Sequence, residues 1–550
     1  MKNTPTGVRW VLMLFALLGV GVDVAHAQSP KDTGFVSMLG ELREATYTDK
    51  ASIAERLIQD GHPNVRAVLT AFLEDRLYFR NDDQKVLLAK SADVDPLNLI
   101  DPVSMQDAGS APVDKLTKIG TNNSLRRMLR TTLARFGLSS PDAGVRLAAV
   151  RDMLRSLDES NVALLRERFD TETNSRVKKE ITTGLALAAL AGSDTRARLE
   201  ALRTLKNSVS QDVRNRVALL LDKNPDGSFI ETDDNVRQAA SASLEVIDEW
   251  RALYSALETL FFGLSLGSVL VLIAIGLAIT FGVMGVINMA HGELMMLGAY
   301  TTYVVQMAMP GHIGISILVA IPAAFIVAGA TGVLLERTII RFLYGRPLET
   351  LLATFGVSLV LQQSVRSIFS ALNRSVVTPD WMSGSLQLND ALAITYNRLY
   401  IVLFTLIVFA IIRIVLRSTR IGLEIRAVSQ NRAMAKAMGI RTEWVDAMTF
   451  GLGSAIAGVA GVALSQLTNV GPNLGQSYII DSFMVVVFGG VGNLWGSLIG
   501  GMSMGIVNQL LEPYSGAVLA KIFVLVALIL FIQIRPRGLF PQTGRSAEDK

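Results

Sequence analysis

The chain has 550 residues, of which 50% are hydrophobic and 18% are charged, whereas soluble domains carry about 25% charged residues. Residues 28–257 contain about twice as many Lys, Arg, Asp and Glu side chains as the longer stretch 258–550. The first part is therefore soluble in character, and the second is suited to lipid. This excludes a single soluble enzyme and a disordered chain. The lack of cysteine excludes disulfides and thiolate metal sites, and a net charge of +4 gives no reason to expect nucleic acid as a partner.

The N-terminus has the features of an export signal. Lys2 and Arg9 precede an apolar stretch over 10–20, and Ala25-His26-Ala27 forms a cleavage pattern. We predict a secretory signal peptide over 1–27. An uncleaved anchor is the alternative, and both readings place residue 28 onward outside the cytoplasm.

Residues 28–250 are predicted to be helical throughout and to form a periplasmic domain. Apolar residues repeat at four-residue spacing, as in Val145, Ala149 and Met153. Several helices open with a similar phrase, which resembles that of HEAT-type repeats: Asn64-Val65-Arg66, Gly144-Val145-Arg146, Asp212-Val213-Arg214 and Asn235-Val236-Arg237. A generic helical domain is the alternative. Proline dipeptides over 91–123 predict a loop-rich interruption. No catalytic constellation is visible, so a binding or docking surface is expected.

From residue 257 the chain has apolar stretches that are long enough to cross a bilayer. They cover residues 258–281, 286–308, 313–336, 349–370, 399–417, 443–468 and 516–534. A further stretch, 479–511, is too long for one span and is interrupted by Gly489, Gly490, Gly492 and Asn493. Such an interruption predicts two half-helices or a re-entrant hairpin, with irregular backbone that protein or a water-lined pathway must satisfy.

Basic residues predict the orientation of these spans. They gather after the third, fifth and last spans, at Arg337, Arg341, Arg346, Arg413, Arg417, Arg420, Arg426, Arg432, Lys436, Arg441, Arg535, Arg537 and Arg545. The positive-inside rule places these loops and the C-terminus in the cytoplasm. If the chain enters the membrane from outside at residue 257 and 479–511 goes in and returns, every basic loop falls on that side.

The longest predicted cytoplasmic loop, 417–441, contains a short amphipathic helix. Ser429 or Asn431 can cap it, Ala433 to Met438 favour helix, and Gly439 can end it. Ala433, Met434 and Ala437 form a small apolar face. Such a helix either inserts into a groove on a partner or lies solvated at the interface.

Ionisable and amide groups at membrane depth mark candidate sites. Asn288, His291 and Glu293 begin the second predicted span, Asp481 opens the interrupted stretch, and Asn493 lies in its break. They either line a pathway or cap and tie broken helices. For His291 and Glu293 we favour the structural role, because the predicted topology puts them near the cytoplasmic end of their span. For Asp481, near the outer end, both roles stay open.

Three segments resemble one family in collinear order. FGVMGVINMAHGELMMLGAY (281–300), VFGGVGNLWGSLIGG (487–501) and RPRGLF (535–540) are similar to motifs of the branched-chain amino acid type of ABC importer permease. The resemblance covers about 258–545. NVGPNLGQSYIIDSFMVVVFGGVGNLWG (469–496), together with the exported domain, is more similar to permeases of urea importers.

The resemblance implies an all-α polytopic permease domain over 257–545, behind the soluble helical domain, in the bacterial inner membrane. It implies a second permease subunit, two ABC ATPase subunits, a periplasmic substrate-binding protein and surrounding lipid as partners. It also implies an ATPase-docking loop with Arg426, Ala427, Ala433, Met434, Ala437 and Gly439, and pathway or helix-break candidates Asn288, His291, Gly292, Glu293, Asp481, Gly489, Gly490, Gly492 and Asn493.

The expected function is urea import, with branched-chain amino acid import as the alternative. A membrane receptor or scaffold is a third reading from another class. No enzymatic activity, metal or bound cofactor is expected. The sequence contains no G-x-x-x-x-G-K-[ST] phosphate loop, so ATP would be used by the partner subunits.

Overall fold

A computed structural model describes residues 30–90, 96–155 and 157–541. The predicted signal peptide lies outside the described residues. The chain folds as two units. Unit 1 contains the described residues up to Ser208 together with Asn215–Leu244, and unit 2 contains Val209–Arg214 and the described residues from Glu245 onward.

Unit 1 begins with three helices and a five-stranded antiparallel sheet. The elements are α2 (Pro30–Glu41), α3 (Tyr47–Asp60), α4 (Val65–Leu73), β1 (Leu77–Arg80), β2 (Val86–Ala89), β3 (Leu97–Ile100), β4 (Asp107–Ala111), the 3-10 helix η1 (Val113–Lys115) and β5 (Leu116–Lys118). The strand order is β4-β3-β2-β1-β5. Leu77 and Leu88 of the sheet join Phe35, Leu57 and Phe72 of the helices in one core. The helices therefore cover one face of the sheet.

This sheet corrects the prediction that residues 28–250 are helical throughout. The predicted loop-rich interruption at 91–123 contains β3, β4 and β5. These strands are only three to five residues long, too short for an alternating pattern to be distinguished from a helical one. Their pairing depends on contacts between segments that are distant in sequence.

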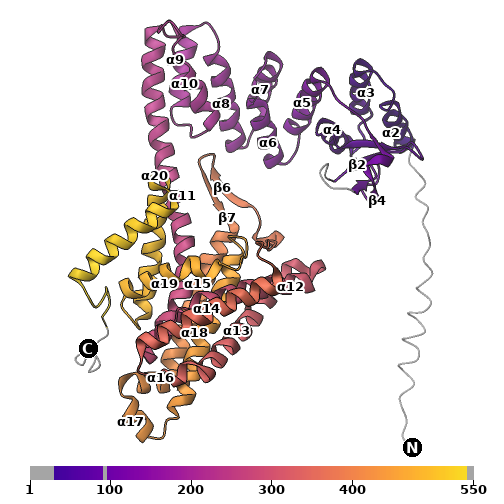
Figure 1. Cartoon of the computed structure of the whole chain (residues 1–550). Helices are drawn as coiled ribbons and strands as arrows, with labels where there is room; N and C mark the ends of the chain where they lie inside the picture. The colour runs from indigo at the N-terminus through magenta and orange to yellow at the C-terminus, as the bar shows by residue number, and fades with distance from the viewer. Residues whose placement is uncertain (1–29, 91–95, 156, 542–550) are drawn as a thin grey trace, which may run out of the picture. The chain divides into compact units, whose positions relative to one another are not determined.

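The rest of unit 1 is helical. It contains α5 (Asn123–Leu138), α6 (Ala143–Leu154), α7 (Glu159–Thr171), α8 (Ser175–Leu190), α9 (Thr195–Leu205), the second part of α10 (Gln211–Leu219) and the start of α11 (Asp234–Met284). Figure 1 shows α5 to α9 stacked in a row. Asn122, Asp142, Asp158, Asn174 and Asp194 begin α5 to α9, and each side chain accepts a hydrogen bond from a first-turn backbone N–H. HEAT-type repetition stays a prediction.

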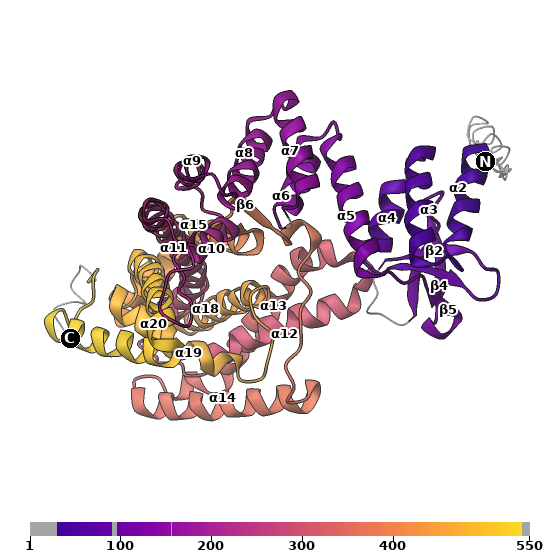
Figure 2. The same cartoon turned by 90° about the horizontal axis from the view of Figure 1, so that it is seen from above.

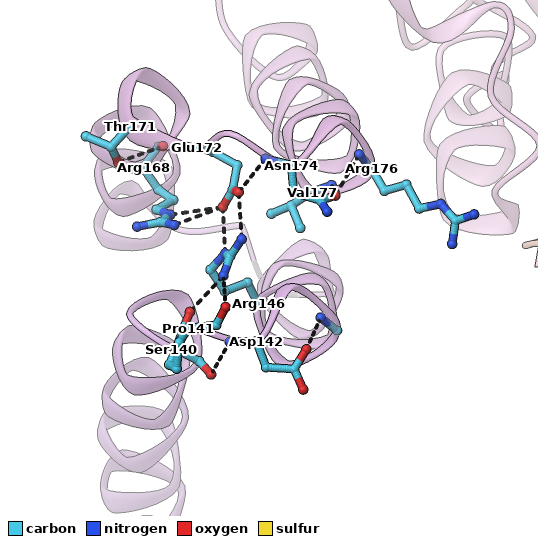
Figure 3. A network of polar contacts seen from close by, with 11 residues as sticks. Ser140, Pro141, Asp142, Arg146, Arg168, Thr171, Glu172, Asn174, Arg176 and Val177 are labelled. Carbon is cyan, nitrogen blue, oxygen red and sulfur yellow. Dashed lines mark hydrogen bonds and ion pairs between the residues drawn. The ribbon is translucent and has the colours of Figure 1, made fainter.

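A buried ion pair joins α6 to the turn between α7 and α8 (Figure 3). Arg146 donates from Nε to Oε2 of Glu172 at 2.8 Å and from Nη2 to Oε1 at 2.9 Å. Arg168 and the backbone N–H of Asn174 also donate to this carboxylate. The Glu172 side chain has no exposed surface. Its hydrogen bonds, above all those from Arg146, lower the pKa of Glu172 to about 2.

Glu172→Gln is expected to lower the midpoint of thermal unfolding of unit 1 by roughly 5–10 °C, because Arg146 would lose its buried counter-charge. The folded-state pKa of Glu172 is depressed, so its stabilisation is present above about pH 4.5 and is lost as the pH falls towards 2. Circular dichroism of the full chain in detergent checks this, with Glu167→Gln on the exposed face of α7 as control. Equal midpoints for the two variants at pH 7 would contradict the prediction.

Unit 2 is a bundle of apolar helices. After α11 it contains α12 (His291–Ala308), η2 (Pro310–His312), α13 (Ile313–Thr338), η3 (Ile340–Phe342), α14 (Pro347–Phe369), η4 (Asp380–Met382), the hairpin β6 (Ser385–Asn389) and β7 (Leu392–Thr395), α15 (Tyr396–Ser418), α16 (Arg420–Gln430), α17 (Arg432–Ala437), α18 (Thr442–Ser465), α19 (Leu474–Gly489) and α20 (Leu494–Ile534). Within the described residues, six helices are long and apolar enough to cross a membrane. The prediction of a polytopic helical membrane protein is confirmed.

Helix boundaries refine the predicted spans. The second span was expected to begin at 286, but residues 285–290 are not helical and α12 begins only at His291. The expected start of another span at 516 coincides with a kink inside α20, where Gly516 has φ +76°. The α20 segment therefore supplies two consecutive helices.

Glycines let the central helices approach closely. A Cβ on Gly458 of α18 would lie 2.5 Å from Cβ of Ala328 on α13 and 2.7 Å from O of Ala324. On its other side α18 meets α12 backbone to backbone, because Gly298 contacts Gly458. Small residues at helix crossings are the usual means of tight packing in membranes. By contrast, α14 lies at the edge of this unit in Figure 2.

Candidate functional site

The irregular segment 285–290 brings the first turn of α12 to the middle of the bundle. Nε2–H of His291 donates to the carbonyl of Ile273 within α11, at 3.1 Å. Oε1 of Glu293 accepts a hydrogen bond from Oγ of Ser358 at 3.0 Å, and Ser358 is the central residue of the 23-residue helix α14. His291 and Glu293 begin their helix, as predicted, but they lie level with the centre of α14 and so deeper in the bundle than a span start at 286 indicates. The reason is that 285–290 returns alongside α11 before α12 starts.

The predicted cluster at the start of α12 is buried and only partly hydrogen-bonded. Oδ1 of Asn288 accepts from the backbone N–H of Ala290 at 3.0 Å. Nδ2 of Asn288, Nδ1 of His291 and Oε2 of Glu293 have no hydrogen-bond partner among the described residues. Gly292 permits close contact with the backbone of Gly475 at the start of α19. The structure thus brings Asn288, His291, Gly292 and Glu293 together, next to the first turn of α19.

Sequence reasoning missed the polar face of α14 that meets this cluster. Every fourth residue of this face is polar: Thr350, Thr354, Ser358, Gln362 and Arg366. Gln362 donates from Nε2 to Oε1 of Glu293 at 2.8 Å, and Oγ1 of Thr354 accepts from the backbone N–H of Met289 at 3.1 Å. The four-residue spacing within an apolar span was a readable signal of a buried polar stripe.

The glycine interruption is a turn at the end of a helical hairpin, and the structure does not bring it to Glu293. Gly490 and Gly492 have φ of +101° and +77°, which favours glycine, and Gly489 packs on Gly496. Asn493 caps α20 by accepting from the N–H of Trp495 and Gly496. The turn lies at the opposite end of α19 from Gly475. The irregular backbone that was predicted for the glycine turn is found inside the bundle at residues 285–290 instead.

The C-terminal tail packs against this turn. The N–H of Leu539 donates to O of Phe488 at 2.9 Å, and the N–H of Phe540 donates to O of Gly489 at 3.1 Å. The segment 535–540 follows the end of α20 and matches one of the family motifs. Its hydrogen bonds fasten the tail to the glycine turn between α19 and α20.

Asp481 is buried and forms an ion pair with a half-exposed lysine. Its Oδ2 lies 2.8 Å from Nζ of Lys521 in the second part of α20, and the same ammonium donates to O of Ser477 at 3.2 Å. The contact ties α19 to α20, which favours the structural reading of Asp481. Lys521 was not anticipated as its partner.

The 417–441 loop forms two helices, α16 and α17, of which only the second was expected. Asn431 caps α17 by accepting from the N–H of Met434 at 2.9 Å, and Gly439 has φ +87° just after it. Arg426 on α16 donates to the carbonyl of Leu416 at the end of α15, so it secures the loop. Ala427 is half-buried and packs against the small apolar core of the loop, so it also stabilises the loop.

The apolar face of α17 points away from the bundle. The helix is anchored by Ala435, which packs with Ile425 and Val445, and by Arg432, whose two terminal nitrogens bond the carboxylate of Asp446. On the other side Ala433, Met434 and Ala437 are exposed. Met434 and Met438 have 60% and 78% of their surface free. A firmly held helix therefore exposes methionines at its surface.

Comparison with known proteins decides the family. The branched-chain amino acid transport system / permease component family matches residues 259–533. The chain is 33% identical over 306 residues to the branched-chain amino acid transport permease LivH of Salmonella typhimurium, covering 54% of this chain and 97% of that protein. It is 30% identical over 308 residues to BraD of Pseudomonas aeruginosa, covering 54% of this chain and 99% of that protein. The chain belongs to this permease family.

The match confirms the family that the three motif segments indicated, and the relatives are transport permeases, not enzymes. A probable LivH of Methanocaldococcus jannaschii is 27% identical over 288 residues, covering 50% of this chain and 88% of that protein. No solved structure matches. The family match begins at residue 259, so the buried cluster, the glycine turn and the α16–α17 loop of the permease all lie within it.

Proposed function

We propose that this permease is the membrane subunit of an ABC importer and that its α16–α17 loop docks a separate ATPase. The observation that carries the proposal is the exposed apolar face of α17, with Met434 and Met438 outward and Arg432 anchored on Asp446. A short amphipathic helix of this kind fits helix-in-groove recognition. Since the sequence lacks a phosphate loop, ATP is hydrolysed by the docked subunits.

The importer would contain a second permease subunit, two ATPases and a substrate-binding protein. The basic loops, including α16–α17, face the cytoplasm, and residues 28–250 lie on the periplasmic side. The known permeases LivH and BraD support this assembly, since each is named as the permease protein of a transport system.

For the substrate we propose urea, on the resemblance of segment 469–496 to permeases of urea importers. Branched-chain amino acids are the second candidate, favoured by the names of the relatives. Both are small nitrogen-containing solutes with N–H donors next to a carbonyl or carboxylate, so both need hydrogen-bonding groups in an otherwise apolar bundle.

Radiolabelled uptake tests the proposal. Cells lacking this chain are given urea or leucine at low concentration, with and without the restored gene, and the affinity-tagged chain is purified to look for bound ATPases. We expect urea uptake to fall to background, leucine uptake to persist and two ATPases to co-purify. Loss of leucine uptake alone would show that the substrate is an amino acid and not urea. Unchanged uptake of both solutes, without ATPases, would overturn the importer in favour of a receptor or scaffold.

A further inference from the structure

Polar side chains surround the first turn of α19 at the surface of unit 2. Arg366 on α14 donates from Nη2 to Oδ1 of Asn473 at 2.6 Å. Asn473 is the residue before α19, and it gives no side-chain cap to the helix. Gln476 and Ser477 in the first turn are exposed. Polar groups are costly against acyl chains, so this surface adjoins water or protein.

The start of α19 also has electrostatic character. First-turn N–H groups have no partner within a helix, and the helix dipole adds partial positive charge there. The N–H of Leu474 donates to the carbonyl of Gly471 at 3.1 Å, and the oxygen of Asn473 that would ordinarily cap the next N–H groups is bonded to Arg366 instead. Lys521 lies beside the same turn, where its ammonium donates to the carbonyl of Ser477 and is paired with Asp481. Arg366 and the helix start therefore make this surface suited to a carbonyl or carboxylate oxygen.

A buried carboxylate lies directly behind this turn. Glu293 has only 1% of its surface exposed, and its Oε2 has no hydrogen-bond partner among the described residues. A Cβ on Gly475 would lie 2.5 Å from that oxygen, so the carboxylate abuts the first turn of α19. The other oxygen, Oε1, is bonded to Gln362, one turn before Arg366 on the same face of α14.

We propose that this helix start is the outer contact site of the solute pathway, and that it takes a small solute carrying both an oxygen acceptor and N–H donors. The acceptor meets the first turn of α19 and Arg366, and the N–H donors replace Gln362 at Glu293. The exchange breaks only side-chain hydrogen bonds at this point, because α14 meets Glu293 through the hydroxyl of Ser358 and the amide of Gln362. The inference rests on the proposed import function. Urea and a zwitterionic amino acid share the required chemistry, and the test below separates them.

Cysteine labelling tests the site, because the chain contains no cysteine. Gln476→Cys and, as a lipid-facing control, Ile411→Cys on the exposed face of α15 are assembled with their partner subunits in membranes. The negatively charged, membrane-impermeant reagent sulfonatoethyl methanethiosulfonate is applied from the outer side. We expect Gln476→Cys to be labelled and uptake to fall at least tenfold, while Ile411→Cys is neither labelled nor inhibited. Protection by urea or by leucine, each with binding protein, identifies the solute.

A second variant makes the test independent of labelling. Glu293→Gln keeps the size of the side chain and is expected to lower uptake at least tenfold at an unchanged amount of assembled importer. Labelling of Gln476→Cys without inhibition, or its failure to label, would overturn the site. If the unlabelled importer takes up neither solute, the proposed function itself fails, which is a distinguishable result.

Discussion

Met434→Glu is expected to abolish solute uptake while leaving the chain in the membrane. Met434 is 60% exposed on a helix that is held from the opposite side by Ala435 and the Arg432–Asp446 ion pair. A carboxylate placed in an apolar groove loses its hydration without gaining a partner, which costs several kcal/mol. Ala433→Glu on the same face is expected to act in the same way. Gly439→Pro would also disrupt the loop, since proline cannot adopt φ +87°.

The measurement combines ATP-dependent uptake into membrane vesicles with co-purification of the ATPase subunits. Both readouts should be lost together, since the substitution acts on docking. Lys436→Gln, an exposed change on another side of α17, is the control and should retain both. Normal uptake by Met434→Glu would refute the docking role of α17.

Gly458→Leu is expected to prevent the permease from folding. The α18 backbone at this position is wedged between α12 and α13, and even a Cβ would lie 2.5 Å from Ala328 and 2.7 Å from the carbonyl of Ala324. Overpacking of a tight core costs about 1–3 kcal/mol and occasionally more, and here a whole isobutyl group meets backbone that cannot rotate away. We expect most of the folded protein to be lost.

Size-exclusion chromatography of the detergent-solubilised chain checks this result. Gly356→Leu on α14 is the matched control, because a Cβ at Gly356 would meet nothing within 4 Å. The control should elute as a single peak at the wild-type amount. A monodisperse Gly458→Leu protein with an unchanged unfolding temperature would contradict the prediction. It would show that α12 and α13 can move apart from α18 without loss of stability.

Several elements of this permease could be predicted from local sequence. Local sequence predicted the charge-poor half, most helical spans and the interruption at 489–493. It also predicted the cap of α17 at Asn431 and its end at Gly439. Each depends on a property that neighbouring residues share: apolar length, helical period, or the conformational freedom of one glycine.

Other features depended on contacts between distant segments. The strands of unit 1 are too short to be recognised from a sequence pattern. They are stabilised by pairing with other strands, as β1 is by both β2 and β5. The depth of Glu293 was misjudged because the hydropathy of 286–290 gives no sign that these residues run back along α11 without forming a helix.

The sequence by itself determined the membrane character of residues 257–534, the family and the helix that carries the exposed methionines. Only the tertiary structure decided that Glu293 meets Gln362 and Gly475, that Asp481 pairs with Lys521, and that the tail closes the glycine turn. The physical reason is that burial and helix formation follow from composition and period along the chain. Which polar groups share a site depends on how separate helices pack.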